Sequence, residues 1–491
     1  MLIKRTNKID APQGATPAVA RKSQIRRATL RQLHESAAHV PAARNDLSPD
    51  LQIERVAIGS LKPAPRRVRR ADPAQTARVM TSIRKFGLCD PLLITKDREI
   101  VDGHAIWEAA RQLGIAEVSC VVVDHLGPAD IRMLRIALNR LGERGAWDLD
   151  ALQIEFQELE MMNEDLVVTG FETAEIDMIL MGDIAETPEE EADSIPEVGK
   201  TAISRPGDVW LLGDHKLIQG DSRDPACYER LMGEAGAARL LLTDVPYNIS
   251  VREITGDGRH REFAMASGEM NRDEFVRFNS AWMTAAADRL VDGGIISTAI
   301  DWRNIDVVME AARSLGLTHL NTAVWSKTNA GQGSLWRSAH ELYPFFRKGT
   351  APHINNIELG RHGRWRSNVW VYPGGSSLGS DSREGLNLHP TVKPRALIED
   401  VLMDITHRGD VVIDCFCGSG STVVAAQATG RRCMAIEIDD LYCDIIVKRW
   451  QDTTGEDAVL EATGETFRST AADRADDDKP TRSEPRKGSN A

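Results

Sequence analysis

Residues 411–422 read VVIDCFCGSGST, and this stretch decides the fold of the second half of the chain. The apolar run predicts a buried strand that ends at Asp414, and the glycines after it predict a turn followed by a helix. Residues 433–437 read CMAIE and predict a second strand, which ends in Glu437, 19 residues after Gly418. This order of strand, glycine turn, helix, strand and terminal acid is typical of α/β domains that hold a nucleoside cofactor.

The glycine turn also narrows the choice of cofactor. A dinucleotide fingerprint needs a third glycine where this chain has Val423, and a phosphate-binding loop needs a lysine after Gly420 that is absent here. S-adenosyl-L-methionine fits better, because it has ribose hydroxyls and a charged amino-acid end but no pyrophosphate. The alternative is a glycine turn with a purely structural role. The candidate cofactor-binding residues of this segment are Asp414, Phe416, Gly418, Gly420, Ser421, Thr422 and Glu437.

A second segment indicates the chemistry. Residues 240–243 (LLLT) predict a strand, and Asp244, Val245, Pro246 and Tyr247 follow at its carboxyl end, where open α/β sheets place their active sites. The amine of a nucleobase is a poor nucleophile because its lone pair is delocalised into the ring. Hydrogen bonds to the Asp244 carboxylate and the Val245 carbonyl would free that lone pair, and Tyr247 would stack on a base flipped out of the duplex. The alternative is a strand-end turn built around a proline.

Together these segments resemble the β-class amino-methylating DNA methyltransferases. The cofactor motif of that family, Asp-x-Phe-x-Gly-x-Gly, matches residues 414–420, and its catalytic motif, Asp-Pro-Pro-Tyr, matches residues 244–247 except at the valine. Residues 389–394 (HPTVKP) precede the cofactor strand, as in members of the family. The resemblance covers residues 204–456 and implies a Rossmann-like, site-specific DNA methyltransferase of the kind found in restriction–modification systems. Such an enzyme transfers a methyl group from S-adenosyl-L-methionine to the exocyclic amine of a flipped base.

The resemblance also implies roles for single residues. Aspartate rather than serine at Asp244 favours adenine N6 as the target, and cytosine N4 is the alternative. Val245 keeps the backbone carbonyl but lacks the fixed φ of proline, so we expect a less preorganised catalytic loop. Lys393 is expected in the cofactor site and Asp221 near the cofactor adenine. A solvated lysine and a simple turn aspartate are the alternatives.

Residues 326–370 contain seven Lys/Arg and only two Glu. Three tryptophans, Trp336, Trp365 and Trp370, lie among these basic residues. Basic groups neutralise phosphates and aromatic rings stack on displaced bases, which favours a DNA contact over a solvated face. Residues 251–270 would form a loop that closes over the target base. The candidate DNA-binding residues are Lys327, Arg337, Arg361, Arg364 and Arg366.

Residues 51–124 resemble the ParB-like nuclease/sulfiredoxin fold. The resemblance rests on residues 61–63 (LKP), 83–87 (IRKFG) and 100–104 (IVDGH). Members usually carry an arginine two places after the histidine, where this chain has Ile106, so we expect a DNA-positioning or protein-contact role instead of nucleotide hydrolysis. A ParB-like DNA-binding protein with a degenerate methyltransferase domain is the rival hypothesis.

Composition limits the remaining choices. With 491 residues and a net charge of −13, the chain is no polycation, and no apolar run approaches the length of a membrane span. Seven cysteines without a CxxC pair predict reduced thiols, no metal site and a cytoplasmic, nucleoid-associated protein. The expected partner is double-stranded DNA, and a homodimer is left open. The predicted order is a flexible basic arm (1–50), the ParB-like domain (51–124), a helical extension (125–184), an acidic linker (185–203), the methyltransferase domain (204–456) and a largely disordered polar tail (457–491).

Overall fold

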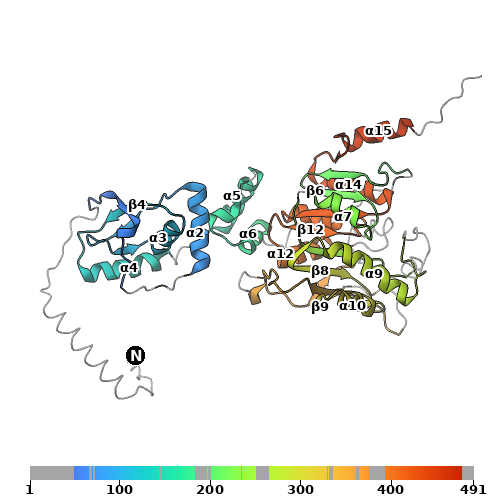
Figure 1. Ribbon diagram of the computed structural model, residues 1–491, viewed down its shortest axis with the longest axis horizontal. Helices are drawn as coiled ribbons and strands as arrows, with labels where there is room; N and C mark the ends of the chain where they lie inside the picture. Colours follow the sequence, from blue (N-terminus) through green and yellow to red (C-terminus); the bar gives the residue numbers. More distant parts are fainter. Residues whose placement is uncertain are drawn as a thin grey trace, which may run out of the picture. The chain divides into compact units, whose positions relative to one another are not determined.

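The computed structural model describes residues 49–477 except 66–68, 70–71, 143–145, 163, 183–195, 197–198, 200, 234, 250–264, 329, 331–334, 361–363 and 375–392. The chain forms two compact units, Met1–Gly145 and Ala146–Ala491 (Figure 1). Within the described ranges, no helix is long and apolar enough to cross a membrane.

The first unit is a four-stranded sheet with the strand order β1-β4-β2-β3. Its small core joins Leu92, Ile94 and Ile100 of the strands to Trp107 of a helix. The helix Pro73–Phe86 ends before Gly87, which has φ +78°, a backbone conformation that glycine adopts readily. The elements are β1 Ile53–Ala57, η1 Ile58–Ser60, α2 Pro73–Phe86, β2 Leu92–Ile94, β3 Ile100–Asp102, α3 His104–Gln112, β4 Glu117–Val122 and α4 Pro128–Gly142.

The second unit is built on a ten-stranded sheet with the order β11-β9-β10-β8-β7-β12-β13-β6-β5-β14 (Figure 1). The five central strands β8, β7, β12, β13 and β6 run parallel, and β10 and β5 run antiparallel to their neighbours. The helices α7, α9 and α10 pack together, as do α12, α13 and α14. This arrangement confirms the predicted Rossmann-like α/β fold.

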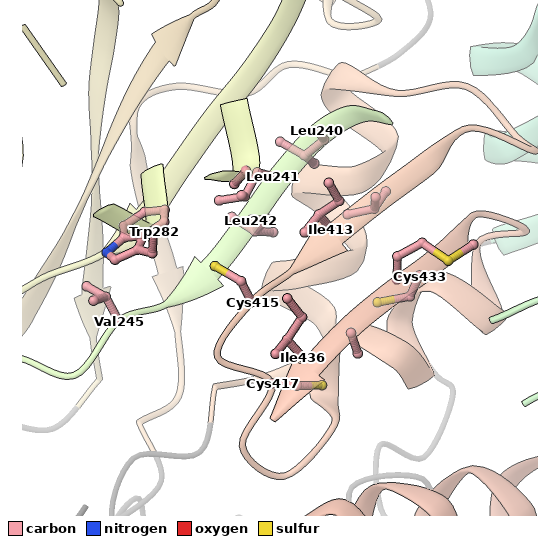
Figure 2. Packing of buried hydrophobic residues seen from close by; sticks show 14 of the residues in the cluster. Leu240, Leu241, Leu242, Val245, Trp282, Ile413, Cys415, Cys417, Cys433 and Ile436 are labelled. Carbon is pink, nitrogen blue, oxygen red and sulfur yellow. The ribbon is translucent and has the colours of Figure 1, made fainter. Parts of the chain in front are cut away.

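The central strands read as apolar runs because both of their faces are buried. Figure 2 shows Leu240, Leu241 and Leu242 beside Ile413 and Ile436 of the neighbouring strands. The strands of this unit are β5 Val209–Leu212, β6 His215–Gln219, β7 Ala238–Asp244, β8 Leu290–Ala299, β9 Thr318–Lys327, β10 His340–Arg347, β11 Val369–Tyr372, β12 Val411–Asp414, β13 Arg432–Glu437 and β14 Val459–Leu460. Its helices are α5 Leu149–Met161, η2 Leu166–Thr169, α6 Thr173–Met181, α7 Pro225–Met232, α9 Arg272–Ala287, α10 Ile305–Ser314, η3 Glu358–Gly360, α12 Arg395–Ile405, α13 Ser421–Ala428, α14 Asp440–Thr454 and α15 Phe467–Asp477.

The predicted helical extension is divided between the two units. Helix α4 belongs to the first unit, whereas α5 and α6 belong to the second. Phe156, Leu166 and Ile176 form a small core of their own between α5, η2 and α6. Apolar periodicity predicts such helices but does not show which domain they join.

The prediction of a polar tail from residue 457 is wrong over its first part. Strand β14 pairs with β5, and Phe467 at the start of α15 lies edge-on against Trp210, with the ring centroids 5.1 Å apart. A two-residue strand is too short to produce a detectable pattern, which explains the error. Residues 478–491 lie outside the described residues, as do residues 1–48 of the predicted basic arm and most of the predicted acidic linker.

All seven cysteines are free thiols, and six of them are buried. Cys415, Cys417 and Cys433 lie among the central strands (Figure 2), and burial raises the pKa of each thiol. Cys89, in the first unit, is exposed.

Candidate active site

The carboxyl ends of the five parallel strands meet at one edge of the sheet, which we call the carboxyl edge. Asp244 ends β7, Asp414 ends β12 and Glu437 ends β13, and Asp221 follows the end of β6. Both predicted motifs therefore lie side by side, because β12 pairs directly with β7. This is the edge at which open α/β sheets bind their ligands.

Asp414 anchors the start of the glycine turn. It accepts hydrogen bonds from the Thr243 hydroxyl at 2.6 Å and from the Phe416 N–H at 3.2 Å. Burial raises the pKa of Asp414 to about 6, although these bonds oppose the shift. Its contacts are thus internal, and they connect the cofactor strand to the strand that carries the catalytic motif.

Glu437 faces the turn from the next strand. Its carboxylate accepts the Gly418 N–H at 2.7 Å and the Asp439 N–H at 2.9 Å, and burial raises its pKa to about 7. Gly418 and Gly420 have φ +55° and +83°, a backbone region that only glycine adopts readily. A Cβ at Gly420 would also lie 3.2 Å from Ile446. A carboxylate beside a glycine turn at a helix start is the donor and acceptor set that a ribose and an amino-acid group need.

The other predicted cofactor-binding residues, Ser421, Thr422, Asp221 and Phe416, do not share one environment. Ser421 and Thr422 are buried in the first turn of α13, and the Ser421 hydroxyl accepts from Arg449 at 3.0 Å. Asp221 is held by Arg223 at 2.6 Å; burial raises its pKa, but the bonds from Arg223 outweigh this and lower it. Phe416 packs against Trp282 with the ring centroids 5.8 Å apart.

Lys393, which was predicted to belong to the cofactor site, contacts two carboxylates beside the predicted catalytic motif. Its Nζ lies 2.5 Å from Asp244 Oδ2 and 3.2 Å from Glu341 Oε2, so its charge is compensated by the catalytic carboxylate and by a second buried carboxylate. We therefore assign Lys393 to the catalytic side of the site. The motif that contains Lys393 does not indicate which carboxylates the lysine binds. Glu341 lies more than fifty residues from Lys393 in the sequence.

Tyr247 completes this cluster. Its hydroxyl lies 3.1 Å from Asp244 Oδ1 and 2.9 Å from Glu341 Oε2, and Lys327 Nζ binds the other Glu341 oxygen at 2.6 Å. The hydroxyl carries a single proton, so it donates to one carboxylate at a time. Two carboxylates and two ammonium groups thus balance their charges around one phenol.

The cluster sets the protonation of its members. Burial raises the pKa of Asp244, and Lys393 only partly opposes the shift. Glu341 is also buried, but the ammonium groups of Lys393 and Lys327 outweigh burial and lower its pKa to about 2. Burial would lower the pKa of Lys393, yet the two carboxylates raise it. Glu341 is therefore the permanent anion of the pair.

The loop of residues 244–247 is hydrogen-bonded by two side chains that were not predicted from the sequence. The Val245 N–H donates to the Thr298 hydroxyl at 3.2 Å, a bond that proline could not make. The Asn304 side chain donates to the Tyr247 carbonyl at 2.8 Å. Thr298 and Asn304 flank the end of β8, the strand beside β7, so only the pairing of these strands identifies them.

Glu341 was also not predicted, because its position in the site depends on strand pairing. It lies at the start of β10, which runs antiparallel to β8, so its first residues reach the carboxyl edge from the other direction. The one available signal was an acid followed by mostly apolar residues in a strand, since a carboxylate is costly to bury without a partner.

Two of the predicted DNA-binding residues, Arg364 and Arg366, bind carboxylates inside the protein. Arg364 is only 5% exposed and binds Asp404 at 2.7 Å and Asp400 at 3.0 Å, so it has no free face for a phosphate. Arg366 binds the same two aspartates, at 2.5 and 2.7 Å. The expectation that these two arginines contact DNA is therefore wrong, because buried carboxylates on α12 occupy them.

The other predicted DNA-binding residues differ in their exposure and in their contacts. Lys327 is bound to Glu341 in the catalytic cluster, and Arg337 is exposed. Of the tryptophans, Trp336 is 82% and Trp365 80% exposed, whereas Trp370 is buried against Tyr343. Arg361, residues 251–264 of the predicted closing loop and residues 389–392 lie outside the described residues.

Comparison with known proteins agrees with this geometry. Residues 238–448 match the family model described as DNA methylase, residues 43–139 match the ParB N-terminal domain, and residues 150–206 match the ParB-methyltransferase HTH domain. The chain is similar to type II methyltransferase M2.DpnII of Streptococcus pneumoniae, with 29% identity over 222 residues that cover 43% of this chain and 81% of that protein.

Two solved structures are also similar. The M1.HpyAVI–SAM complex is 18% identical and covers 48% of this chain and 97% of its own, with a TM-score of 0.36. The PvuII DNA methyltransferase, cytosine-N4-specific, is 16% identical and covers 53% of this chain and 98% of its own, also with a TM-score of 0.36.

These matches confirm the predicted family and the predicted ParB-like domain. They also add an HTH segment that the sequence analysis treated as a helical extension and linker. Residues 238–448 therefore form a DNA methyltransferase domain of the N6/N4 family, which uses S-adenosyl-L-methionine, and this domain follows a ParB N-terminal domain.

Proposed function

We propose that this enzyme methylates the N6 amine of adenine in double-stranded DNA, with the target base flipped into the cluster around Asp244. The observation that carries the proposal is the adjacency of Asp244 and Tyr247 to the glycine turn, through the direct pairing of β7 with β12. A flipped base at this edge would meet a carboxylate and an aromatic ring together.

Asp244 and the Val245 carbonyl would hold the amine. Each accepts one N–H, which draws the nitrogen toward tetrahedral geometry and frees its lone pair. Asp244 Oδ1 now faces the Tyr247 hydroxyl, so the amine must take the place of that hydroxyl. Glu341 Oε2, at 2.9 Å, offers the hydroxyl another acceptor, so that no buried donor is left unpaired when the base enters.

Lys393 keeps Asp244 in position through its contact with Oδ2. Because Lys393 also touches Glu341, its ammonium remains compensated if Asp244 takes up the proton that the amine releases. Asp244 suits this role, because burial has already raised its pKa.

The cofactor would lie between the glycine turn and the catalytic cluster. Glu437 would accept its ribose hydroxyls, and Asp221 would lie beside its adenine. When bound, S-adenosyl-L-methionine supplies an electrophilic methyl group on a sulfonium. The chain's own contribution is the placement of the amine, which accounts for much of the rate in such reactions.

The test is analysis of the product. DNA from cells that express the protein is digested and its nucleosides are separated by mass spectrometry, with an Asp244→Ala strain as the control. We expect N6-methyladenine in the first sample and none in the control. N4-methylcytosine instead would support the alternative target, and no methylated base in either sample would contradict the proposal.

A further inference from the structure

The segment from Ala146 to Gly182, most of which matches the HTH model, has an unusual charge for a DNA-binding element. It contains ten Asp/Glu and no Lys, Arg or His. Protein affinity for duplex DNA comes largely from cations that neutralise phosphates. A surface of this composition repels the DNA backbone. Seven of the ten acids are exposed, namely Asp148, Asp150, Glu155, Glu158, Glu160, Glu164 and Asp165.

The second helix of the segment is not available as a reading helix. In DNA-binding helix-turn-helix motifs this helix enters the major groove with polar side chains. Here it is α6, with the sequence TAEIDMILM, and Ala174, Ile176 and Asp177 are buried in it. Ile176 packs against Phe156 of α5.

Helix α6 is fastened to the methyltransferase domain by a buried ion pair. Asp177 binds the Arg431 guanidinium at 2.8 and 2.9 Å, and both side chains are at most 1% exposed. Arg408 adds contacts to Asp177 at 3.3 Å and to Glu160 of α5. Arg364 reaches Met178 from the domain side, at 4.0 Å.

The position of this contact separates it from the catalytic site. Arg431 directly precedes β13 and Arg408 precedes β12, so both lie at the edge where these parallel strands begin. The active site lies where they end. Glu437 is the sixth residue after Arg431, which corresponds to roughly 20 Å along a strand.

We infer that the segment from Ala146 to Gly182 is a docking module that binds the chain's own methyltransferase domain at the edge opposite the catalytic site and makes no contact with DNA. Its interaction surface is the buried side of α6, and the partner that fits this surface is the arginine cluster of Arg431, Arg408 and Arg364. One of these arginines, Arg364, was predicted from its sequence context to bind DNA, but its contacts lie inside the protein.

The first experiment measures hydrogen–deuterium exchange of the full chain with and without a pool of random-sequence 30-base-pair duplexes at low salt. We expect no change within the segment from Ala146 to Gly182, and slower exchange at the carboxyl edge, around residues 244–248 and 298–304. Protection of α5 or α6 by the duplex would overturn the inference.

The second experiment tests the docking contact. In Asp177→Asn, Arg431 keeps its charge but loses its carboxylate, so exchange in α6 should speed up by about 10²–10³-fold, the effect of breaking a buried ion pair. Glu155→Gln, which removes an exposed acid of α5, is the matched control and should leave exchange unchanged. DNA affinity and its salt dependence should be unchanged in both variants. Unaltered exchange of α6 in Asp177→Asn, or weaker DNA binding by that variant while α6 stays protected, would overturn the docking assignment.

Discussion

Half-buried Asp244 and buried Glu341 belong to one cluster, yet the pKa values of their carboxylates move in opposite directions. Glu341 touches two ammonium groups, so its pKa falls to about 2, whereas Asp244 touches one and its pKa rises. The carboxylate that we propose as the proton acceptor and the carboxylate with the lowered pKa therefore lie within reach of the same phenol. Environment, not residue type, separates the two roles.

Replacing the first of these carboxylates tests the division of labour at the site. Asp244→Ala should lower methyl transfer by at least about 10²–10³-fold, because one preorganised polar group at the reacting centre is lost. The affinity for S-adenosyl-L-methionine should stay nearly constant, since Glu437 and the glycine turn are untouched. Transfer of labelled methyl to DNA and calorimetric titration measure the two quantities. Full activity would contradict our assignment of the active site.

The valine of the catalytic motif makes a second test. The sequence suggested that Val245→Pro would tighten the loop, but the structure shows a hydrogen bond from this N–H to Thr298. We expect Val245→Pro to lower stability by about 1 kcal/mol and not to raise turnover. Thr298→Val removes the same bond from the other side, so the double variant should be little worse than either single one. Additive losses in chemical denaturation would show that the bond does not link the two positions.

Glu437 gives the cofactor site a pH dependence. Burial raises its pKa from 4.5 to about 7, so its contribution to stability is full below pH 4.5 and is lost as the pH rises through 7. Cofactor affinity should move the other way, because ribose hydroxyls donate best to the ionised carboxylate. Titrations from pH 5.5 to 8.5 should show affinity that increases up to about pH 7. Glu437→Gln should flatten this increase, and an equal slope in both proteins would exclude Glu437 as its source.

At the scale of elements, two aspartates of α12 and the arginines Arg364 and Arg366, which precede β11, form an ionic cluster where a DNA surface was predicted. Arg364→Ala leaves Asp400 and Asp404 with Arg366 as their remaining arginine partner and should lower the free energy of unfolding by about 3 kcal/mol. The salt dependence of DNA binding should not change. Arg337→Ala, at an exposed candidate, should instead reduce the log–log slope by about 1 with little effect on stability. Denaturation and binding titrations at several salt concentrations distinguish the two outcomes, and the reverse pattern would restore the original assignment.

The elements also show what sequence can and cannot provide. Residues 411–422 predicted β12, the turn and α13 correctly, because an apolar run and glycines at fixed positions are local signals. The contacts of Lys393 and Arg364 depend on partners far away in the sequence, and the local pattern of basic and aromatic residues did not reveal the aspartates that bind Arg364. Glu341 was not predicted, since an acid joins the cluster around Asp244 only when strand pairing brings it to the carboxyl edge.

At the scale of the whole molecule, the unit that contains the methyltransferase domain extends beyond residues 204–456, the range of the sequence resemblance. A fragment of residues 146–477 includes Asp177, β14 and α15, and it should bind S-adenosyl-L-methionine as tightly as the full chain. The fragment 204–456, the extent of the sequence resemblance, leaves Arg431 buried without its carboxylate and exposes Trp210. It should melt roughly 10 °C lower, as expected for the loss of a few kcal/mol. Equal melting temperatures would show that neither flanking segment supports the domain.

The distribution of the thiols has a practical consequence. Six cysteines are buried and have no ready thiolate, whereas Cys89 lies exposed after α2 in the ParB-like unit. A maleimide dye therefore has a single target on the native enzyme, without any engineered residue. Fluorescence from that position would follow the ParB-like unit through a catalytic cycle whose chemistry takes place in the other unit.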